Sequence, residues 1–409
     1  MATGADHDVA IVGAGILGLA VARELLARKP ALRVVVVDKE GAVGTHQTGH
    51  NSGVVHAGIY YEPGSLKARL CVEGAARLSA FCQRNGIRFD RCGKLIVALD
   101  PSELGRLDRL EERGRANGVP GLRRLRGEEI AEVEPHAAGI AALHSPHTAI
   151  VDFPGVAQAL AAEVRERGGE LRLGREVAAV RTTAGLRRGV VLTGSDGEPA
   201  AEARRAVFCA GAWADRLAVA AGAPADPRIV PFRGQYLRLK PGARRLVRGL
   251  VYPVPDPELP FLGVHLTRHV SGDVLLGPSA LLVGARDAYR LSTVRAADLA
   301  SALAWPGTWR VARRWWRTGV EELRLAASRR AFVQACARYV PELGPADVEA
   351  GWAGVRAQAV SREGRLVDDF VFSEAGGALH VRNAPSPAAT SALAIGEVIA
   401  DRAAEAFDL

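Results

Sequence analysis

The chain has 409 residues, a formal net charge of +8 at pH 7 and a hydrophobic fraction of 48%. These values are ordinary for a soluble globular protein of two or three domains. Only five of the 53 basic residues are lysines. No basic tract interleaved with aromatic residues marks a nucleic-acid module, so a nucleic-acid partner is excluded.

The stretch Val9–Asp38 has the order strand, glycine turn, helix, strand and acid. In the G-x-G-x-x-G turn, Gly13 allows the tight bend and Gly15 lets backbone approach a pyrophosphate, while Gly18 lets the helix pack on the strand. Asp38 is placed to accept a hydrogen bond from a ribose hydroxyl. This order predicts a dinucleotide site, although it does not distinguish FAD from a nicotinamide cofactor.

A loop rich in glycine, histidine and threonine follows at Gly44–Tyr61. Helical periodicity then begins at Pro63 and continues to Gly86. A strand is predicted at Lys94–Leu99 and a polar helix over Pro101–Asn117, whereas Arg123–Glu134 is typical of a charged surface segment.

The middle of the chain continues this alternation. A helix is predicted after Val151–Pro154, and four strand patterns follow it: Glu170–Leu173, Val177–Thr182, Gly189–Leu192 and Ala206–Ala210. Together with the first strand–helix–strand unit, they predict a parallel sheet covered by helices.

From Pro224 to about Pro345 the prolines cluster, and extended runs such as Gln235–Leu239 and Val274–Leu276 predict an antiparallel sheet. Helices are predicted at Arg295–Ala304 and Val320–Tyr339. The remaining predicted elements are strands at Phe370–Phe372 and Leu379–Arg382 and a final helix after Pro387.

We therefore expect an α/β fold with one discontinuous, Rossmann-like dinucleotide domain formed by residues 1–87, 150–222 and 350–409. An α+β substrate domain built on an antiparallel sheet, residues 88–149 and 223–349, is inserted into it.

Two further turns narrow the choice of cofactor. The apolar strand Ala206–Ala210 ends on Gly211-Ala212-Trp213, and Gly354-Val355-Arg356 follows near the C-terminus. In combining these turns with a single N-terminal fingerprint, the chain resembles the D-amino-acid oxidase class of FAD enzymes. The resemblance implies an FAD-binding domain in place of a nicotinamide site.

Five longer segments resemble the L-2-hydroxyglutarate dehydrogenase/oxidase family: Thr45–Tyr61, Pro231–Tyr236, Pro260–Arg268, Gly354–Ala359 and Asn383–Ala392. The resemblance implies FAD-dependent oxidation of L-2-hydroxyglutarate to 2-oxoglutarate by hydride transfer to flavin N5, with electrons passed to a quinone or oxygen. Two alternatives remain: another oxidase of the class, acting on an amino acid, sarcosine or glycerol 3-phosphate, and a dinucleotide-binding protein without redox chemistry.

The resemblance and the fingerprint together imply a set of cofactor-binding residues. They are Gly13, Gly15, Ile16, Gly18, Asp38, Lys39, Thr45, His46, Thr48, Asn51, Ser52, Val177, Gly211, Trp213, Pro387 and Ala388. Many FAD proteins carry Glu where this chain has Asp38, but the shorter acid can still bond a ribose.

The implied substrate is a small dicarboxylate, and arginine suits a carboxylate because it can bond both oxygens. The expected substrate-binding residues are Arg233, Tyr236, Arg268, Arg356, Tyr60 and Ser386. For Arg268 the alternative is a salt bridge on an edge strand.

Oxidation of an alcohol also needs a base for the hydroxyl proton, and histidine has a suitable pKa. His56, in the flavin loop, is the first candidate, and its alternative is a structural hydrogen bond to the flavin ring. His265 is the second candidate and has the alternative of binding a substrate carboxylate.

At the C-terminus, Ser386 and Pro387 are predicted to be the cap and first residue of a helix. In this fold class such a helix directs its N-terminus at the flavin pyrimidine ring, where it stabilises the anion that develops on reduction.

Trp305–Trp316 combines four of the six tryptophans with several arginines. It predicts either peripheral contact with a membrane interface, on the cytoplasmic face of an inner membrane, or a helix that packs its tryptophans on the substrate domain.

Five scattered cysteines without C-x-x-C spacing argue against a zinc site or disulfides and fit a reducing cytosol. The first eight residues are polar and unlike a secretory signal. The longest apolar stretch, Val9–Ala22, is too short to cross a bilayer. We expect a cytoplasmic protein without a resident metal.

Overall fold

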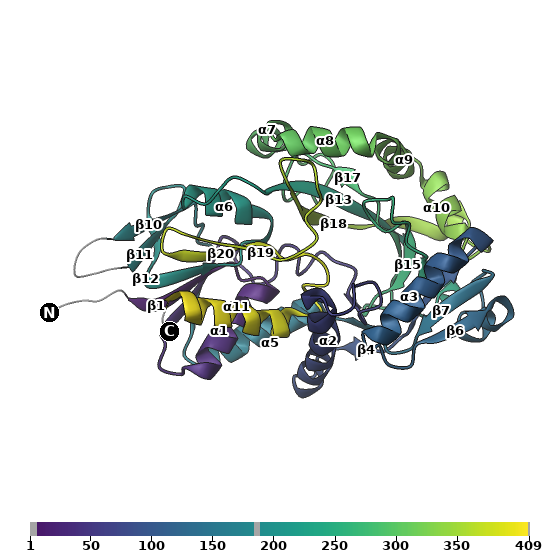
Figure 1. The fold of residues 1–409 in the computed structure, drawn as a ribbon, viewed down its shortest axis with the longest axis horizontal. Helices are drawn as coiled ribbons and strands as arrows, with labels where there is room; N and C mark the ends of the chain where they lie inside the picture. Colours follow the sequence, from purple (N-terminus) through teal and green to yellow (C-terminus); the bar gives the residue numbers. More distant parts are fainter. Residues whose placement is uncertain (1–5, 184–188, 408–409) are drawn as a thin grey trace.

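The computed structural model describes residues 6–183 and 189–407, which form two large sheets covered by helices and one small sheet (Figure 1). The small sheet joins three short strands: β3 (Val54–Val55), β8 (Ala149–Val151) and β4 (Phe89–Asp90). This architecture is the predicted α/β fold, with a second large sheet beside the first.

The first sheet is built on the fingerprint. Strands β1 (His7–Val12) and β2 (Val34–Asp38) are parallel, with β9 (Glu170–Leu173) beyond β2 and β12 (Pro199–Phe208) beyond β1. Both faces of these apolar runs are buried, as expected for parallel strands between helices.

Helices cover this sheet on two sides. One core cluster joins it to α1 (Ile16–Arg28), α5 (Phe153–Glu166) and α11 (Ala392–Phe407). A second cluster joins the other face to α6 (Ala214–Ala220). Strand β20 (Ala378–Asn383) completes the sheet beside β12, with β19 (Val371–Ala375) at the edge.

Two strands of this sheet run against the prediction. β10 (Ala179–Thr183) and β11 (Gly189–Thr193) are antiparallel to each other, and β11 is antiparallel to β12. The prediction of a parallel sheet is wrong here because the connections are short, whereas parallel neighbours need a crossover of a dozen residues or more.

The second sheet has nine strands, and all its neighbouring pairs are antiparallel except β14 with β5. Its strands are β5 (Lys94–Ala98), β6 (Arg123–Arg126), β7 (Ala141–Ser145), β13 (Arg228–Leu239), β14 (Leu250–Pro253), β15 (His265–Arg268), β16 (Val274–Gly277), β17 (Leu281–Leu282) and β18 (Val348–Val360). The predicted domain boundary at residue 350 falls inside β18, which pairs with β13. The division of the chain into domains stays a prediction.

Several helices begin or end away from their predicted positions. α2 (Leu66–Arg84) begins after Ser65, whose Oγ accepts the Ala68 N–H at 3.2 Å, and so does not begin at Pro63. The helix predicted over 320–339 is broken at Ser328, whose Oγ accepts the Ala331 N–H at 3.2 Å.

The outer helices follow one another around the second sheet. α7 (Ala296–Leu303), α8 (Pro306–Arg314), α9 (Trp316–Ala327) and α10 (Arg329–Ala337) form an arc along its outer edge (Figure 1). α3 (Leu104–Ala116) lies at the other end of this sheet, near β7 (Figure 1), and the short α4 (Ile130–Val133) follows β6 in the sequence.

Within the described ranges, no helix is long and apolar enough to span a membrane. The five cysteines are free. The same ranges hold no group of three or more His, Cys, Asp or Glu side chains suited to a metal ion. Residues 1–5, part of the polar N-terminal segment, lie outside the described residues.

A buried ion cluster links the first sheet to the outer helices. Arg286, only 2% exposed, donates to both carboxylate oxygens of Asp215 and to the carbonyl of Ala212. Asp298 accepts the Arg286 backbone N–H at 2.9 Å, and Asp215 accepts the Ile229 N–H at 3.0 Å. The cluster therefore fixes the turn that follows β12.

We expect Arg286→Met to lower the free energy of unfolding by about 3–5 kcal/mol, because it leaves Asp215 as a buried charge without its partner. Arg295→Met is the matched control: the Arg295–Asp287 pair is exposed on the arginine side, and its loss costs less than about 1 kcal/mol. Denaturant unfolding measures both values, and equal values would contradict the prediction.

Candidate active site

A cavity of about 990 Å³ opens at the carboxyl ends of β1, β2 and β12 and is also lined by residues of the second sheet. The carboxyl ends of parallel strands are the usual ligand site of such sheets, and this volume suits a cofactor. All but three of the predicted site residues line this cavity; the exceptions are Gly18, Arg233 and Arg268.

The glycine turn is held against β12 so closely that side chains do not fit. A Cβ on Gly13, which has φ +110°, would lie 2.4 Å from the Cys209 carbonyl oxygen. A Cβ on Gly18 would lie 1.9 Å from the Gly13 carbonyl oxygen. Gly18 therefore lets helix and strand pack, as predicted, without facing the cavity. A Cβ on Gly15 would have only Thr48 Oγ1 within 4 Å, at 3.5 Å, so this side of the turn leaves room for a ligand.

The N-terminus of α1 faces the cavity with little to neutralise it. Its cap residue Gly15 supplies no side-chain hydrogen bond, and the first turn has no acidic residue. Thr48 Oγ1 accepts the Ile16 N–H at 3.1 Å. Asp38 accepts N–H groups of Ala14 at 2.6 Å and Glu40 at 2.9 Å. The chemistry and shape of this region fit a pyrophosphate beside a ribose.

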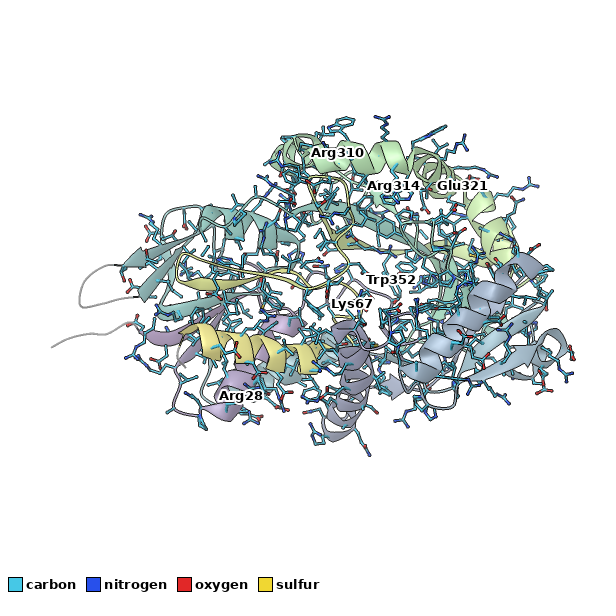
Figure 2. All side chains as sticks on the ribbon, viewed as in Figure 1. Arg28, Lys67, Arg310, Arg314, Glu321 and Trp352 are labelled. Atoms are coloured by element: carbon cyan, nitrogen blue, oxygen red, sulfur yellow. The ribbon has the colours of Figure 1, made fainter. Side chains whose placement is uncertain are left out.

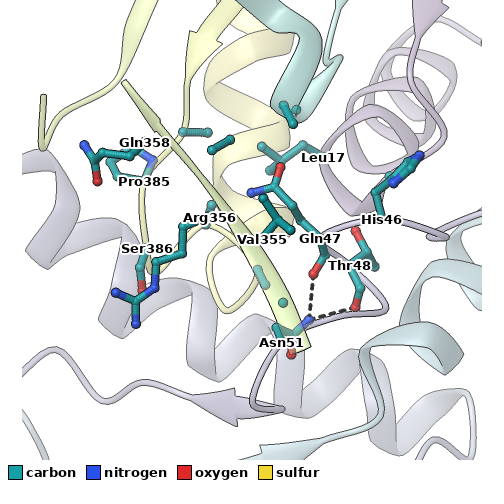
Figure 3. Close-up of a pocket in the computed structure, with 18 of the residues that line it drawn as sticks. Leu17, His46, Gln47, Thr48, Asn51, Val355, Arg356, Gln358, Pro385 and Ser386 are labelled. Atoms are coloured by element: carbon teal, nitrogen blue, oxygen red, sulfur yellow. Dashed lines mark hydrogen bonds between the residues drawn. The ribbon is translucent and has the colours of Figure 1, made fainter. Parts of the chain in front are cut away.

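The loop after β2 is folded by its own side chains (Figure 3). The Asn51 amide donates to the carbonyls of Gln47 at 3.0 Å and Thr48 at 2.7 Å. Its Oδ1 accepts the Gly53 N–H at 2.8 Å. Asn51 therefore lines the cavity and also fixes the curve of the loop, which carries Ser52 and Thr45 along the same wall.

Aromatic and charged groups gather at the end of the cavity nearest Asp38. The Lys39 ammonium lies 3.7 Å from the Trp213 ring centroid, and the His46 ring lies 4.7 Å from the same ring. His46 Nε2 is 2.9 Å from Glu40. Burial lowers the pKa of His46. Val177 and Gly211 line the same cavity, so all these predicted cofactor residues share one site.

The opposite end carries a cation without a carboxylate partner. Arg356, on β18, lies over the Phe261 ring with its Cζ 4.8 Å from the centroid, and Figure 3 shows it beside Ser386. Within residues 6–183 and 189–407 it forms neither an ion pair nor a side-chain hydrogen bond. Tyr236 lines the wall near it, and the Tyr60 hydroxyl is buried without a partner in these ranges. Burial raises the pKa of both phenols, which remain hydrogen-bond donors.

Two histidines line this end. Burial lowers the pKa of His56 to about 3, and the charge of Lys94 adds to the effect. Burial also lowers the pKa of His265 to about 3. His265 Nδ1 lies 2.9 Å from the Gly263 carbonyl, which accepts only an N–H, so the neutral ring leaves Nε2 as an acceptor. An acceptor does not bind a carboxylate, and the geometry favours a proton-accepting role for His265 over carboxylate binding.

Two of the three predicted arginines lie outside the cavity. Arg268 pairs with Asp90 at 3.1 Å, so it forms a salt bridge as in the alternative, although β15 lies between β14 and β16 and is not an edge strand. Arg233 is buried and donates to the Tyr289 carbonyl at 3.2 Å and to Gln235 at 3.0 Å. Their predicted role as substrate ligands is therefore corrected, since both guanidinium groups are held by other partners.

The C-terminal turn differs from the predicted helix start. α11 begins at Ala392, so Ser386 is not its cap. The residues between them form turns, and the Ala392 N–H donates to the carbonyl of Ala389, three residues earlier, where a regular α-helix would use the residue four earlier. Pro387 and Ala388 still line the cavity. This turn brings Thr390 Oγ1 to 3.1 Å from the His56 backbone N–H, a positioning contact that the sequence pattern does not predict.

Lys94 is a buried lysine beside the site that the motifs do not identify. It is 3% exposed, with its Nζ 3.7 Å from the Tyr252 ring centroid and 4.4 Å from that of Tyr60. Tyr252 stacks on His265 at 3.9 Å. One feature of the sequence could have drawn attention to Lys94: it is a lysine at the start of an apolar strand, in a chain that has only five lysines.

The family comparison agrees with this site. The model of the FAD dependent oxidoreductase family matches residues 8–402. The chain is therefore an FAD-dependent oxidoreductase, with FAD as the cofactor that the glycine cradle and the long cavity fit.

Closer relatives define the family within this class. The human mitochondrial L-2-hydroxyglutarate dehydrogenase is 45% identical and covers 100% of this chain and 91% of its own. The Nematostella vectensis protein of the same name is 46% identical over 98% of this chain and 91% of its own, and the Indibacter alkaliphilus L-2-hydroxyglutarate dehydrogenase is 42% identical over 98% and 100%. The chain belongs to the L-2-hydroxyglutarate dehydrogenase family.

Solved structures agree on the fold. The FAD-bound L-alpha-glycerophosphate oxidase of Mycoplasma pneumoniae has a TM-score of 0.78 at 23% identity, covering 98% of this chain and 95% of its own. The glycine oxidase of Geobacillus kaustophilus has a TM-score of 0.69 at 23% identity, with 97% and 94% covered.

We expect kcat/KM for flavin reduction to show no acid limb near the ordinary histidine pKa of about 6.5. Because the pKa of both His56 and His265 is lowered, their rings are already neutral throughout about pH 5 to 7, and kcat/KM reports the free enzyme. Stopped-flow reduction across this range measures the profile. A tenfold fall per pH unit below about 6.5 would contradict it.

Proposed function

We propose that this chain oxidises L-2-hydroxyglutarate to 2-oxoglutarate with FAD as its cofactor. The observation that carries the proposal is Arg356, a cation without an acidic partner among the described residues, placed at the end of a cofactor cavity beside two neutral histidines. A carboxylate of the substrate satisfies Arg356, and a 2-hydroxy acid presents its alcohol beside that carboxylate. The names of the full-length relatives support the same substrate.

The residues at this end have complementary roles in the proposed reaction. Arg356, with Tyr236 and Tyr60 as donors, holds the substrate. His56 takes the hydroxyl proton, since its ring is neutral and forms no side-chain hydrogen bond within the described chain. His265, with its Nε2 as acceptor, is the second candidate base. FAD, held by the glycine turn and the loop after β2, would supply flavin N5 as the hydride acceptor.

Anaerobic addition of substrate tests this function directly. We expect L-2-hydroxyglutarate to bleach the flavin absorbance of the purified protein, while D-2-hydroxyglutarate, glycine and glycerol 3-phosphate leave it unchanged. No bleaching by the L-enantiomer, or equal bleaching by any of the other compounds, would sink the proposal.

His56→Ala should slow this bleaching by about two orders of magnitude or more, the size expected for loss of a general base. His265→Ala is measured beside it to assign the base, and flavin content verifies that each variant holds FAD. A near-normal rate for His56→Ala would show that another residue is the base.

We further propose a quinone as electron acceptor, with oxygen as the alternative, and a membrane-facing surface on α8 and α9. Trp305 and Trp315 pack inward, with their indole N–H groups donating to Val360 at 3.0 Å and Glu258 at 3.1 Å. Trp309 and Trp316 are each 59% exposed, and Val320 and Leu323 extend their apolar surface.

Basic residues flank these apolar side chains. Arg313, Arg314 and Arg317 are exposed on the same two helices. Figure 2 places Arg314 and Arg310 on the outer arc, with Glu321 further along it. Exposed tryptophan beside arginine suits an anionic membrane interface, whereas Trp305 and Trp315 fit the packing alternative.

Co-sedimentation with vesicles measures this contact. We expect binding to phosphatidylglycerol vesicles and about tenfold weaker binding of the Trp309→Ala/Trp316→Ala variant. Ile140→Ala, which removes an exposed apolar side chain elsewhere, is the control. Unchanged binding of the tryptophan variant would remove this surface from consideration.

A further inference from the structure

Lys94 is a buried cation that the proposed mechanism does not use. Its ammonium lies between the ring of Tyr60, from the loop after β3, and the ring of Tyr252 on β14. Within the described chain it forms no ion pair and no hydrogen bond. A buried ammonium is costly without a counter-charge, and two ring faces compensate only part of that cost.

The position of Lys94 is fixed by the second sheet. It begins β5 and is paired with Leu250 on β14 and Ser145 on β7. Both tyrosines that enclose its ammonium line the cavity. The charge of Lys94 reaches both His56 and His265, so it acts on the substrate end although two rings separate it from the cavity.

Of the other basic groups that line the cavity, Arg175 has no side-chain partner among the described residues, but it lies at the Asp38 end, where its backbone N–H donates to the Asp38 carbonyl. Lys39 is bound to Glu40 at 3.2 Å. Lys67 is bound to Asp368 at 2.7 Å, and Arg216 to Asp298 at 2.7 Å. Arg382 donates to two backbone carbonyls. The only described carboxylate whose charge acts on the pKa of Arg356 is Glu322, which forms no ion pair with it and accepts the Ala280 N–H at 2.6 Å. Arg356 and Lys94 thus leave two positive charges around His265 without carboxylate partners.

We propose that Lys94 is a specificity-determining residue that supplies the second positive charge of the substrate end and so makes the site prefer a dicarboxylate over a monocarboxylate. Arg356 meets one carboxylate, and the field of Lys94 stabilises the second through the tyrosine rings. This role rests on the proposed function, since it concerns the same substrate.

Titration of Lys94 gives the site a further property. Burial lowers the pKa of Lys94 to about 7, against an opposing effect of Cys71 on α2. The other titratable groups facing it are Tyr60, Tyr252 and the two histidines. A bound dianion favours the protonated ammonium, so the affinity for a dicarboxylate falls as pH rises through about 7, while that for a monocarboxylate changes less.

The test compares L-2-hydroxyglutarate with L-2-hydroxyvalerate, which has the same carbon chain without the distal carboxylate. In Lys94→Met, we expect kcat/KM for the dicarboxylate to fall about ten- to hundredfold, mainly through KM, as loss of one short-range charge interaction predicts. The value for the monocarboxylate should change by less than about threefold. Lys94→Arg should restore part of the preference, and Lys240→Met, which removes an exposed charge, should leave it unchanged.

Two measurements keep the outcome decisive. Glutarate binding, followed by the flavin spectrum, should weaken in Lys94→Met by a factor similar to that in kcat/KM. In the wild type, the preference for the dicarboxylate should decline above about pH 7, a readout that needs no variant. An equal loss for both substrates, or a preference independent of both Lys94 and pH, would overturn the role of Lys94. A wild type inactive on L-2-hydroxyglutarate would instead overturn the proposed function.

Discussion

The backbone contact between the start of α1 and the end of β12 is the constraint on which the rest of the structure depends. A Cβ at Gly13 would lie 2.4 Å from the Cys209 carbonyl oxygen, so the strand, the helix and the turn meet without side chains between them. This contact leaves the positive end of α1 facing the cavity, where a pyrophosphate is stabilised. A bound FAD would reach along the cavity from this anchor, so the anchor decides which lining residues, from His56 to Arg356, would meet its reactive end.

At the substrate end of the cavity, charge rather than close packing determines what the site can bind. The residues there combine neutral histidines with cations that have no acidic partner in the described chain. Burial keeps both imidazoles neutral at physiological pH, and the charge of Lys94 adds to this effect, so each ring keeps a nitrogen lone pair that can accept a proton. Burial therefore sets the charge state of the histidines, and the cations, which attract the substrate, add a smaller effect in the same direction.

Local sequence patterns predict much of this molecule. The glycine fingerprint, the loop of Asn51 and His56, and Arg356 reach one cavity as expected, because short-range geometry and long motifs define them. Strand direction at β10 and β11 was not predictable from apolar pattern alone, since parallel and antiparallel strands share it. For a related reason the sequence pattern gave no signal that Lys94 is buried beside the site and left two alternatives for Arg268: β5 pairs with β14, which is distant in sequence, and Arg268 pairs with Asp90.

The pairing of β18 with β13 has a consequence for how the protein is made. Residues 354–358 and 381–390, near the end of the chain, line the same cavity as Gly13 and His56. During synthesis, which proceeds from the N-terminus, the glycine turn therefore exists long before the wall opposite it, and the cofactor site closes only when nearly the whole chain has emerged. Contacts of such high sequence separation also form slowly. The half-built sheet edges of β12 and β13 are thus the surfaces that a nascent chain has to protect from wrong pairing until β20 and β18 arrive.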